Sequence, residues 1–276
     1  MGLRSHSIEH NSCHLTYDVR GNGAPVLFIQ GVGVHGDGWL PQVNSLADTY
    51  TCVSFDNRGM ARSQPVSQDL TVAQMADDVR AILDAEGWST AHIVGHSLGG
   101  LIALEFAISH PKRVCSLSLM CTFANGRDAA PLTLRMAWAG LRSRVGTRRM
   151  RREGFLKLLM PPPSPTGREA EALAERLAPL FGHDIADQPP IVNAQLRAMR
   201  ATDTTLRLGE LAGIPTLVVV GAHDPISPPK LGKVLATGIP GAKYVEYADA
   251  SHGLPIQWAD RVNVLLREHI GTKATG

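Results

Sequence analysis

The sequence has no long apolar run. No stretch of about 18 consecutive apolar residues occurs in it, so we expect no transmembrane helix. The opening residues, MGLRSHSIEHNSCH, lack the apolar core of a secretory signal peptide. Position 6 is His, where a myristoylation motif needs Ser or Thr. We therefore expect a cytoplasmic protein with no lipid anchor and no membrane span.

Patterns typical of metal-binding cysteines are also missing. The four cysteines, Cys13, Cys52, Cys115 and Cys121, form neither a CxxC pair nor the Cys/His spacing of a zinc site. We therefore expect free thiols and no bound metal. The formal net charge is only +2 and no nucleic-acid-binding motif accompanies it, so we expect no nucleic-acid partner.

The chain does contain a regular alternation of predicted strands and helices. Of its 276 residues, 44% are hydrophobic and 19% are charged, which is typical of a globular protein with a sizeable core. The alternation predicts an α/β fold with a mainly parallel central sheet covered by helices on both faces. The expected strands are residues 13–20, 26–29, 51–55, 91–94, 114–120, 216–220 and 243–247, and the expected helices are residues 71–86, 97–109, 230–235 and 258–270.

The helix expected from Thr71 has the clearest start signal. Thr71 can cap the helix, and Gln74 three residues later completes a capping box. An apolar stripe follows at helical spacing. We interpret this segment as a scaffold helix that packs on the sheet.

The alternation stops between residues 122 and 205. This stretch has a helical pattern interrupted by proline, with PPPSP at residues 161–165. We interpret it as a helical cap inserted into one main domain. The predicted division is therefore a core made of residues 1–121 and 206–276, and a cap, or lid, made of residues 122–205.

The strongest chemical signal is a G-x-S-x-G pattern, formed by Gly95, His96, Ser97, Leu98 and Gly99. It stands between a predicted strand and a predicted helix, which is the context of a nucleophile elbow. Glycines are needed on both sides because larger side chains would collide across so tight a turn. The serine hydroxyl is then exposed at a helix N-terminus, where developing negative charge is favoured.

A serine hydroxyl becomes a good nucleophile only when a base takes its proton and an acid orients that base. His252 follows the strand predicted at 243–247, and Asp224 follows the strand predicted at 216–220. Both therefore lie at the carboxyl ends of strands, where open α/β sheets place their sites. The sequence predicts Ser97 as nucleophile, His252 as base and Asp224 as acid.

Other histidines and acids compete for these roles. Three histidines that we expect to precede the sheet, and to be structural, are His6, His10 and His14. His183 and His223 stay open as alternative bases. Asp249 is close to His252 in the chain, but it shares the same short loop, which makes the far ring nitrogen awkward to reach.

Acyl transfer also needs backbone donors for the oxyanion of its tetrahedral intermediate. The N–H of Leu98, directly after the nucleophile, is the first expected donor. The second is expected in the glycine-rich loop QGVGVHGDGW, at the N–H of Val32. Gly31 in this loop and His96 beside the nucleophile are expected to contact the substrate.

The same loop also fits another class of protein. Gly31, Gly33 and Gly36 spell G-x-G-x-x-G, and Asp56 follows 20 residues after Gly36, as in a dinucleotide-binding fingerprint. An NAD(P)-binding oxidoreductase is therefore an alternative. Against it, the residues that follow, DGWLP, make a poor first turn for a helix, and the ordered Ser, Asp and His residues stay unexplained.

With these residues in place, the chain resembles the α/β-hydrolase superfamily, in particular the small capped bacterial esterases, enol-lactonases and cofactor-free haloperoxidase-like enzymes. The segments that carry the resemblance are FDNRGMARS (55–63), GHSLGG (95–100), GAHDPISP (221–228) and ASHG (250–253). It implies an α/β-hydrolase fold and hydrolysis of a small ester or lactone without a cofactor. Two positions differ, because Gln30 replaces the family's usual His and Ala61 replaces a glycine.

The predicted cap is rich in arginine. Seven arginines and no acidic residue lie between Arg135 and Arg152. A solvated helix face is one interpretation. The other is the docking of an anionic carrier or substrate tail. In this feature the chain resembles esterases that act on acyl-carrier proteins. The nearby Met136 and Trp138 are expected to line a substrate pocket or the core of the cap.

These features predict a carboxylic ester hydrolase that works through an acyl-enzyme on Ser97. Carbon–carbon bond hydrolysis, perhydrolysis and acyl transfer use the same catalytic parts, so they stay open as alternatives. A non-catalytic ligand receptor on the same scaffold is a further class. Such a receptor does not require an intact set of Ser, His and Asp.

Overall fold

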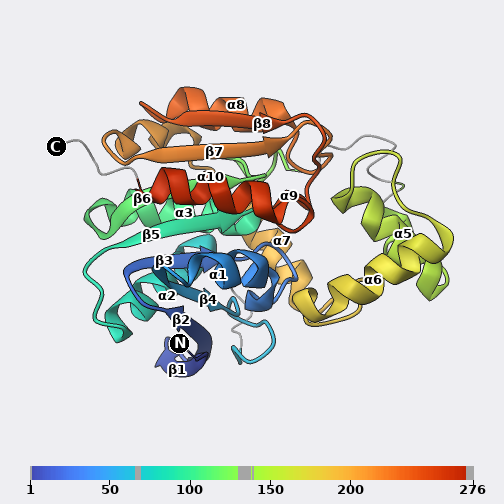
Figure 1. Ribbon diagram of the computed structural model, residues 1–276, viewed down its shortest axis with the longest axis horizontal. Coiled ribbons are helices and arrows are strands. Elements are labelled where there is room, and N and C mark those ends of the chain that lie inside the picture. The colour runs from blue at the N-terminus through green and yellow to red at the C-terminus, as the bar shows by residue number, and fades with distance from the viewer. Residues whose placement is uncertain (1, 66–69, 130–137, 139, 272–276) are drawn as a thin grey trace.

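The computed structural model describes residues 2–65, 70–129, 138 and 140–271. Its centre is an eight-stranded sheet with the strand order β1-β2-β4-β3-β5-β6-β7-β8 (Figure 1). The strands are β1 (Arg4–His10), β2 (Cys13–Gly21), β3 (Ala24–Ile29), β4 (Tyr50–Phe55), β5 (Ala91–His96), β6 (Val114–Met120), β7 (Thr216–Gly221) and β8 (Lys243–Tyr247). β2 is antiparallel to β1 and β4, and the other neighbours are parallel. The mainly parallel sheet predicted from the sequence is confirmed.

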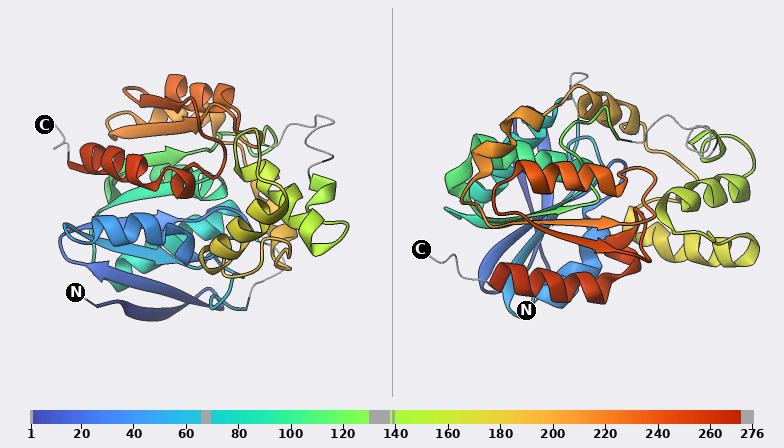
Figure 2. Two further views of the ribbon diagram at one scale, coloured as in Figure 1. Left: turned by 45° about the vertical axis from the view of Figure 1, so that its right-hand side comes forward. Right: turned by 90° about the horizontal axis from the view of Figure 1, so that it is seen from above.

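Helices cover both faces of this sheet (Figure 2). The first face carries α2 (Val72–Ala85), α3 (Leu98–Ser109) and α8 (Pro229–Gly238). The second face carries α1 (Leu40–Leu46), the short α9 (Leu254–Gln257) and α10 (Ala259–Gly271). The α/β architecture with helices on both faces is therefore the one that the sequence predicts.

Strand β7 shows why the sheet needs two helical layers. Its residues Val218 and Val220 belong to the core on the first face, and Leu217 and Val219 belong to the core on the second. Successive side chains of a strand point to opposite faces, so an uninterrupted apolar run must be covered on both sides. The same holds for β3, whose last four residues are all fully buried.

β1 is an element that the sequence analysis did not predict. Its sequence, RSHSIEH, contains one apolar residue, Ile8, and is largely exposed, so it shows no apolar period. Backbone pairing with β2 along its whole length holds it at the edge of the sheet. His6 and His10 therefore lie in β1 and His14 lies in β2, and the expectation that these histidines precede the sheet is wrong.

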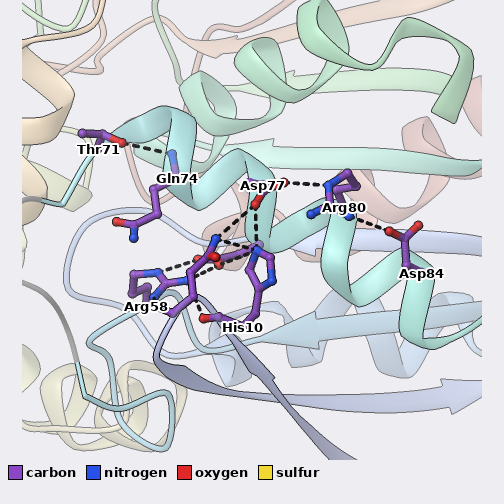
Figure 3. Close-up of polar contacts among 9 residues, drawn as sticks. His10, Arg58, Thr71, Gln74, Asp77, Arg80 and Asp84 are labelled. Carbon is purple, nitrogen blue, oxygen red and sulfur yellow. Dashed lines mark hydrogen bonds and ion pairs between the residues drawn. The ribbon is translucent and has the colours of Figure 1, made fainter.

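Thr71 caps α2 as the sequence predicts. The N–H of Gln74 donates to Thr71 Oγ1 at 3.0 Å (Figure 3). The second half of the expected capping box does not form, because Gln74 Oε1 has no hydrogen-bond partner among the described residues. One cap contact is enough to start the helix, since the apolar side of α2 packs against the core.

A buried ion pair joins α2 to the loop after β4 and to the turn after β1. Arg58 Nε donates to Asp78 Oδ2 at 3.0 Å, and the side chains of both residues are 1% exposed. The two terminal nitrogens of Arg58 also donate to the carbonyl oxygens of His10 and Asn11, each at 3.1 Å (Figure 3). Arg58 therefore ties three separate parts of the chain together beneath the surface.

Arg58→Ala is expected to lower the free energy of unfolding by about 3–5 kcal/mol, because it leaves the Asp78 carboxylate buried without its charged partner. Arg80→Ala on α2 is the matched control, since its partners Asp77 and Asp84 are 34% and 45% exposed. Such surface pairs contribute about 0–1 kcal/mol. Urea denaturation measures both losses. Equal losses in the two variants would contradict the structural role given to Arg58.

Three further helices, α5 (Arg148–Leu159), α6 (Gly167–Phe181) and α7 (Val192–Arg200), lie to one side of the sheet (Figures 1 and 2). We call residues 148–200 the α5–α7 segment. α5 and α6 share a small apolar core with Val34 of the loop after β3. A 3-10 helix, η3 (Thr205–Leu211), leads from this segment back to β7. Among the described residues, no helix is long and apolar enough to cross a membrane.

Candidate active site

Ser97 stands in a strained turn between β5 and α3. Its φ of 55° and ψ of −120° lie outside the regions that residues other than glycine normally adopt. The glycines on either side make this turn possible. A Cβ on Gly95 would lie 2.3 Å from the carbonyl oxygen of Gly99, and a Cβ on Gly99 would lie 2.1 Å from that of Ile29. The elbow therefore needs glycine at both positions for steric reasons.

The backbone of Ser97 is held from both sides. Its N–H donates to the carbonyl oxygen of Met120 at 3.0 Å, at the end of the neighbouring strand β6. Its own carbonyl oxygen accepts from Thr122 Oγ1 at 2.6 Å. These bonds fix the strained conformation and leave the hydroxyl at the start of α3.

Asp224 and His252 meet at the ends of the next two strands. His252 Nδ1–H donates to Asp224 Oδ2 at 2.8 Å, although the two residues follow different strands, β7 and β8. The other carboxylate oxygen, Asp224 Oδ1, accepts the N–H groups of Ile226 and Ser227, both at 2.8 Å. The side chains of Asp224 and His252 are 0% and 6% exposed, so this hydrogen bond lies in a low-dielectric environment.

The residues that compete for these roles lie elsewhere. Asp249 is exposed and pairs with Arg261 at 3.0 Å rather than with His252. His223 is exposed, and its backbone N–H donates to the carbonyl oxygen of Ala250. His183 contacts the backbone of the loop after β3, not Ser97. The structure therefore brings Asp224 to His252 and leaves the alternatives out of this arrangement.

His96 lies against the proposed base. Its Nε2–H donates to the carbonyl oxygen of His252 at 2.9 Å, and the centroids of the two rings are 4.8 Å apart. Burial, with a smaller contribution from the nearby His252, lowers the pKa of His96 to about 3. His96 is therefore a neutral donor at ordinary pH and supports the loop that carries His252.

Two backbone N–H groups near Ser97 are free. Among the hydrogen bonds of the described residues, none uses the N–H of Val32 or of Leu98. The N–H groups on either side of Val32 are both taken. Gly31 donates to Gln30 Oε1 at 3.1 Å, and Gly33 donates to Gln195 Oε1 at 2.9 Å. The two donors expected from the sequence are thus available to a ligand.

Gln30 fills the place where the resembled family has His. It is 4% exposed, its Oε1 accepts the N–H of Gly31, and its backbone oxygen accepts from Asn57 Nδ2 at 2.9 Å. Gly38 makes room for its amide, because a Cβ there would lie 2.3 Å from Gln30 Nε2. The glutamine therefore keeps the loop tightly held despite the change of residue.

A cavity of about 570 Å³ lies between these loops and the α5–α7 segment. Ser97, His252, His96 and Gly31 all line it. Most of the remaining wall is apolar, with Trp39, Leu159, Phe181, Leu196 and Ile256 among its residues. A small polar site at the base of an apolar pocket is typical of a small-molecule site.

Of the two other pocket residues expected from the sequence, only Trp138 is among the described residues. Trp138 is 59% exposed, lies under the guanidinium of Arg142, and is absent from the described residues that line the cavity. Met136 and Arg135 lie outside the described residues.

Most of the arginines counted between residues 135 and 152 already have acidic partners. The ion pairs are Arg148–Asp184, Arg152–Asp184, Arg152–Glu171, Arg149–Glu153 and Arg151–Asp187. Hydrogen bonds from Arg152, which outweigh the effect of burial, hold the pKa of Asp184 well below its usual range. Arg144 and Arg200 are different, because both line the cavity, where no carboxylate lies among the described lining residues.

Cys121, which directly follows β6, was not predicted from the sequence as a site residue. Its φ is 46° and it is fully buried. Its Sγ lies within 4.8 Å of a ring nitrogen of His96 and of His252. Burial, together with the nearby Asp224, raises the pKa of this thiol well above its usual value. A metal needs the thiolate, so this donor set fits a metal poorly and we assign none.

The loop after β3 also lacks the geometry of a dinucleotide site. Gly36 opens a short 3-10 helix, η1 (Gly36–Trp39), rather than a long helix packed on the sheet. Its N–H donates to Asp56 Oδ1 at 3.0 Å, and Asp56 also pairs with Arg62. The groups that would bind pyrophosphate and ribose in that alternative are therefore engaged with each other.

The strand order, the elbow at Ser97 and the bonded pair Asp224–His252 together define a known class. The model of the α/β hydrolase fold family matches residues 24–257, and the chain belongs to this family. The resemblance drawn from the sequence motifs is thus confirmed.

Three proteins illustrate the likeness. The protein named "Putative carbamate hydrolase RutD" of Azorhizobium caulinodans is 30% identical over 91% of this chain and 93% of its own length. A solved structure of a thermophilic esterase from Thermogutta terrifontis, with malate bound, has a TM-score of 0.78 and 26% identity, covering 99% of this chain and all of its own. The structure of Est816, described as an N-acyl homoserine lactone degrading enzyme, has a TM-score of 0.78 and 27% identity, covering 95% and 99%.

Proposed function

We propose that the protein hydrolyses a carboxylic ester or lactone through an acyl-enzyme on Ser97. The observation that carries this proposal is the 2.8 Å hydrogen bond between His252 Nδ1 and Asp224 Oδ2, together with the cavity that His252 and Ser97 both line. The bond fixes the proton on Nδ1 and leaves Nε2 of His252 free to accept the serine proton.

The proposed reaction has two steps. Ser97 Oγ attacks the carbonyl carbon while His252 Nε2 takes its proton, and Asp224 stabilises the imidazolium that forms. The N–H groups of Val32 and Leu98 stabilise the oxyanion. His252 then protonates the leaving alcohol. Water, activated by the same histidine, attacks the acyl-enzyme, releases the acid and restores Ser97.

The shape and charge of the cavity support a largely apolar substrate that carries one anionic group. Its wall is mainly apolar, but Arg144 and Arg200 also line it without an acidic neighbour among the described lining residues. The esterase neighbour holds malate, a dicarboxylate. We propose that residues 122–205 act as a cap that closes over such a substrate.

Initial rates with a panel of activated esters test this function. We expect hydrolysis of p-nitrophenyl esters, and faster turnover of mono-p-nitrophenyl glutarate than of p-nitrophenyl pentanoate, which has the same chain length without the carboxylate. Arg144→Gln should reduce that preference and leave the rate of pentanoate hydrolysis unchanged. A γ-lactone and a carbamate in the same panel place the activity among those of the relatives.

Covalent labelling tests the acyl-enzyme independently of the substrate. An organophosphate should inactivate the protein and, after digestion, mass spectrometry should find the label on Ser97. Label on another residue, or no hydrolysis of any ester, lactone or carbamate in the panel, would overturn the proposal. If Ser97 is labelled but nothing in the panel is hydrolysed, carbon–carbon hydrolysis, perhydrolysis and acyl transfer are the activities to examine next.

A further inference from the structure

Gly33, next to the proposed oxyanion donor Val32, is held from the other side of the cavity. Its N–H donates to Gln195 Oε1 on α7 at 2.9 Å. Its carbonyl oxygen accepts from His183 Nε2, in the loop after α6, at 2.8 Å. These two bonds join residues that are 162 and 150 positions apart in the chain. Both polar groups of one residue are therefore bonded to the α5–α7 segment.

We propose that Gln195 and His183 are positioning residues that set the oxyanion hole by clamping Gly33. The inference rests on the proposed acyl-enzyme function. The peptide unit that carries the N–H of Val32 is planar and lies between two anchored units. Gln30 holds the unit before it through Gly31, and Gln195 holds the unit after it through Gly33. The free N–H of Val32 can then turn very little.

Close packing supports the clamp. Gly33 has φ +70°, and a Cβ on it would lie 2.9 Å from Val192 Cγ2 on α7. The N–H of His35 donates to the carbonyl oxygen of Phe181 at 3.3 Å. Gly182, which ends α6, makes room for this histidine, since a Cβ there would lie 1.9 Å from His35 Nδ1. The loop and the two helix ends therefore lie in close contact.

Burial of Gln195 is energetically unfavourable unless its side-chain oxygen is needed at this position. It is 0% exposed, and its Nε2 has no hydrogen-bond partner among the described residues. A buried donor without a partner is destabilising, and an apolar side chain of the same size would avoid that loss. Such a side chain would leave the N–H of Gly33 unpaired. The amide oxygen must face Gly33, because only an acceptor can bond an N–H.

His183 extends the clamp into the arginine-rich helix. Asp184 follows His183 in the chain, and its carboxylate accepts from Arg152 Nε at 3.0 Å and from Arg148 Nε at 2.7 Å. The Arg152 side chain is 7% exposed. These paired arginines of α5 therefore brace the segment that holds Gly33, which is a structural use for part of the arginine cluster.

The test is Gln195→Met, which keeps the length of the side chain and removes the acceptor. We expect kcat to fall by about 10- to 100-fold. This loss is smaller than the loss of about 10²- to 10³-fold that follows complete removal of an oxyanion donor. KM should change much less, because the clamp acts on the transition state. The affinity for a trifluoromethyl ketone, which forms a tetrahedral adduct with the serine, should fall by the same factor as kcat/KM.

Asn193→Met is the matched control, since it makes the same kind of change on the exposed side of α7. It should leave kcat unchanged. Titration with an organophosphate counts the folded sites, so a fall in kcat per site is separated from a loss of folded protein. His183→Leu provides a second variant, and the double variant should lose less than the product of the two single losses, because both side chains hold one residue.

Three outcomes are kept apart by this design. If the wild type hydrolyses esters and Gln195→Met retains its kcat per site and its affinity for the ketone, the clamp is wrong and the proposed function stands. If kcat per site falls while the affinity for the ketone does not, the positioning role is also wrong. If the wild type hydrolyses nothing in the panel and does not bind the ketone, the proposed function fails and the clamp fails with it.

Discussion

Ser97→Ala is expected to lower kcat by about 10⁶-fold while substrate binding is retained. Alanine keeps the Cβ and the same backbone strain at φ 55°, so the elbow is unchanged apart from the missing hydroxyl. Without that oxygen no acyl-enzyme can form, and the remaining rate comes from the oxyanion donors and binding alone. Steady-state rates with the best p-nitrophenyl ester give kcat, and equilibrium binding of a non-hydrolysable amide analogue gives the affinity.

Ser109→Ala is the control for this variant, because Ser109 is exposed at the end of the same helix, α3. It should keep the full rate and the full stoichiometry of organophosphate labelling. Full activity in Ser97→Ala would overturn the acyl-enzyme mechanism. A large loss of activity in both variants would point to an effect on α3 rather than on a nucleophile.

The sequence was sufficient to predict those features of the structure whose determining contacts are local. The elbow around Ser97 depends on two glycines within two residues of it, and the cap of α2 depends on one hydrogen bond between Thr71 and Gln74. The positions of Asp224 and His252 followed from the rule that strands of a parallel sheet place their carboxyl ends together. In each case a short segment and its place in the fold contain the physical cause.

Other features depend on contacts that no local pattern records. β1 forms by backbone pairing with β2 and has no buried apolar face, so its side chains give no signal. The partner of Gly33, Gln195, is 162 residues away and looks like any polar residue of an amphipathic helix. The acids that pair with the arginine-rich stretch, such as Asp184, come from later in the chain, so the stretch itself does not reveal these ion pairs.

Asp224→Asn is expected to lower kcat by about 10⁴-fold, although the side chain keeps its shape. In the native protein Asp224 Oδ1 accepts two backbone N–H groups, from Ile226 and Ser227, while Oδ2 accepts from His252 Nδ1. An asparagine must place its oxygen at the two N–H donors, which turns its NH₂ group toward His252. His252 Nδ1 must then accept, so the ring proton moves to Nε2, where the base needs its lone pair.

Asp249→Asn should retain the native rate, since Asp249 is 52% exposed and pairs with Arg261. Rates of the two variants, with circular dichroism to verify folding, decide between these carboxylates. A large loss in Asp249→Asn with a small one in Asp224→Asn would contradict the assignment of Asp224 as the acid. Asp249 would then hold that role, which requires a different orientation of His252.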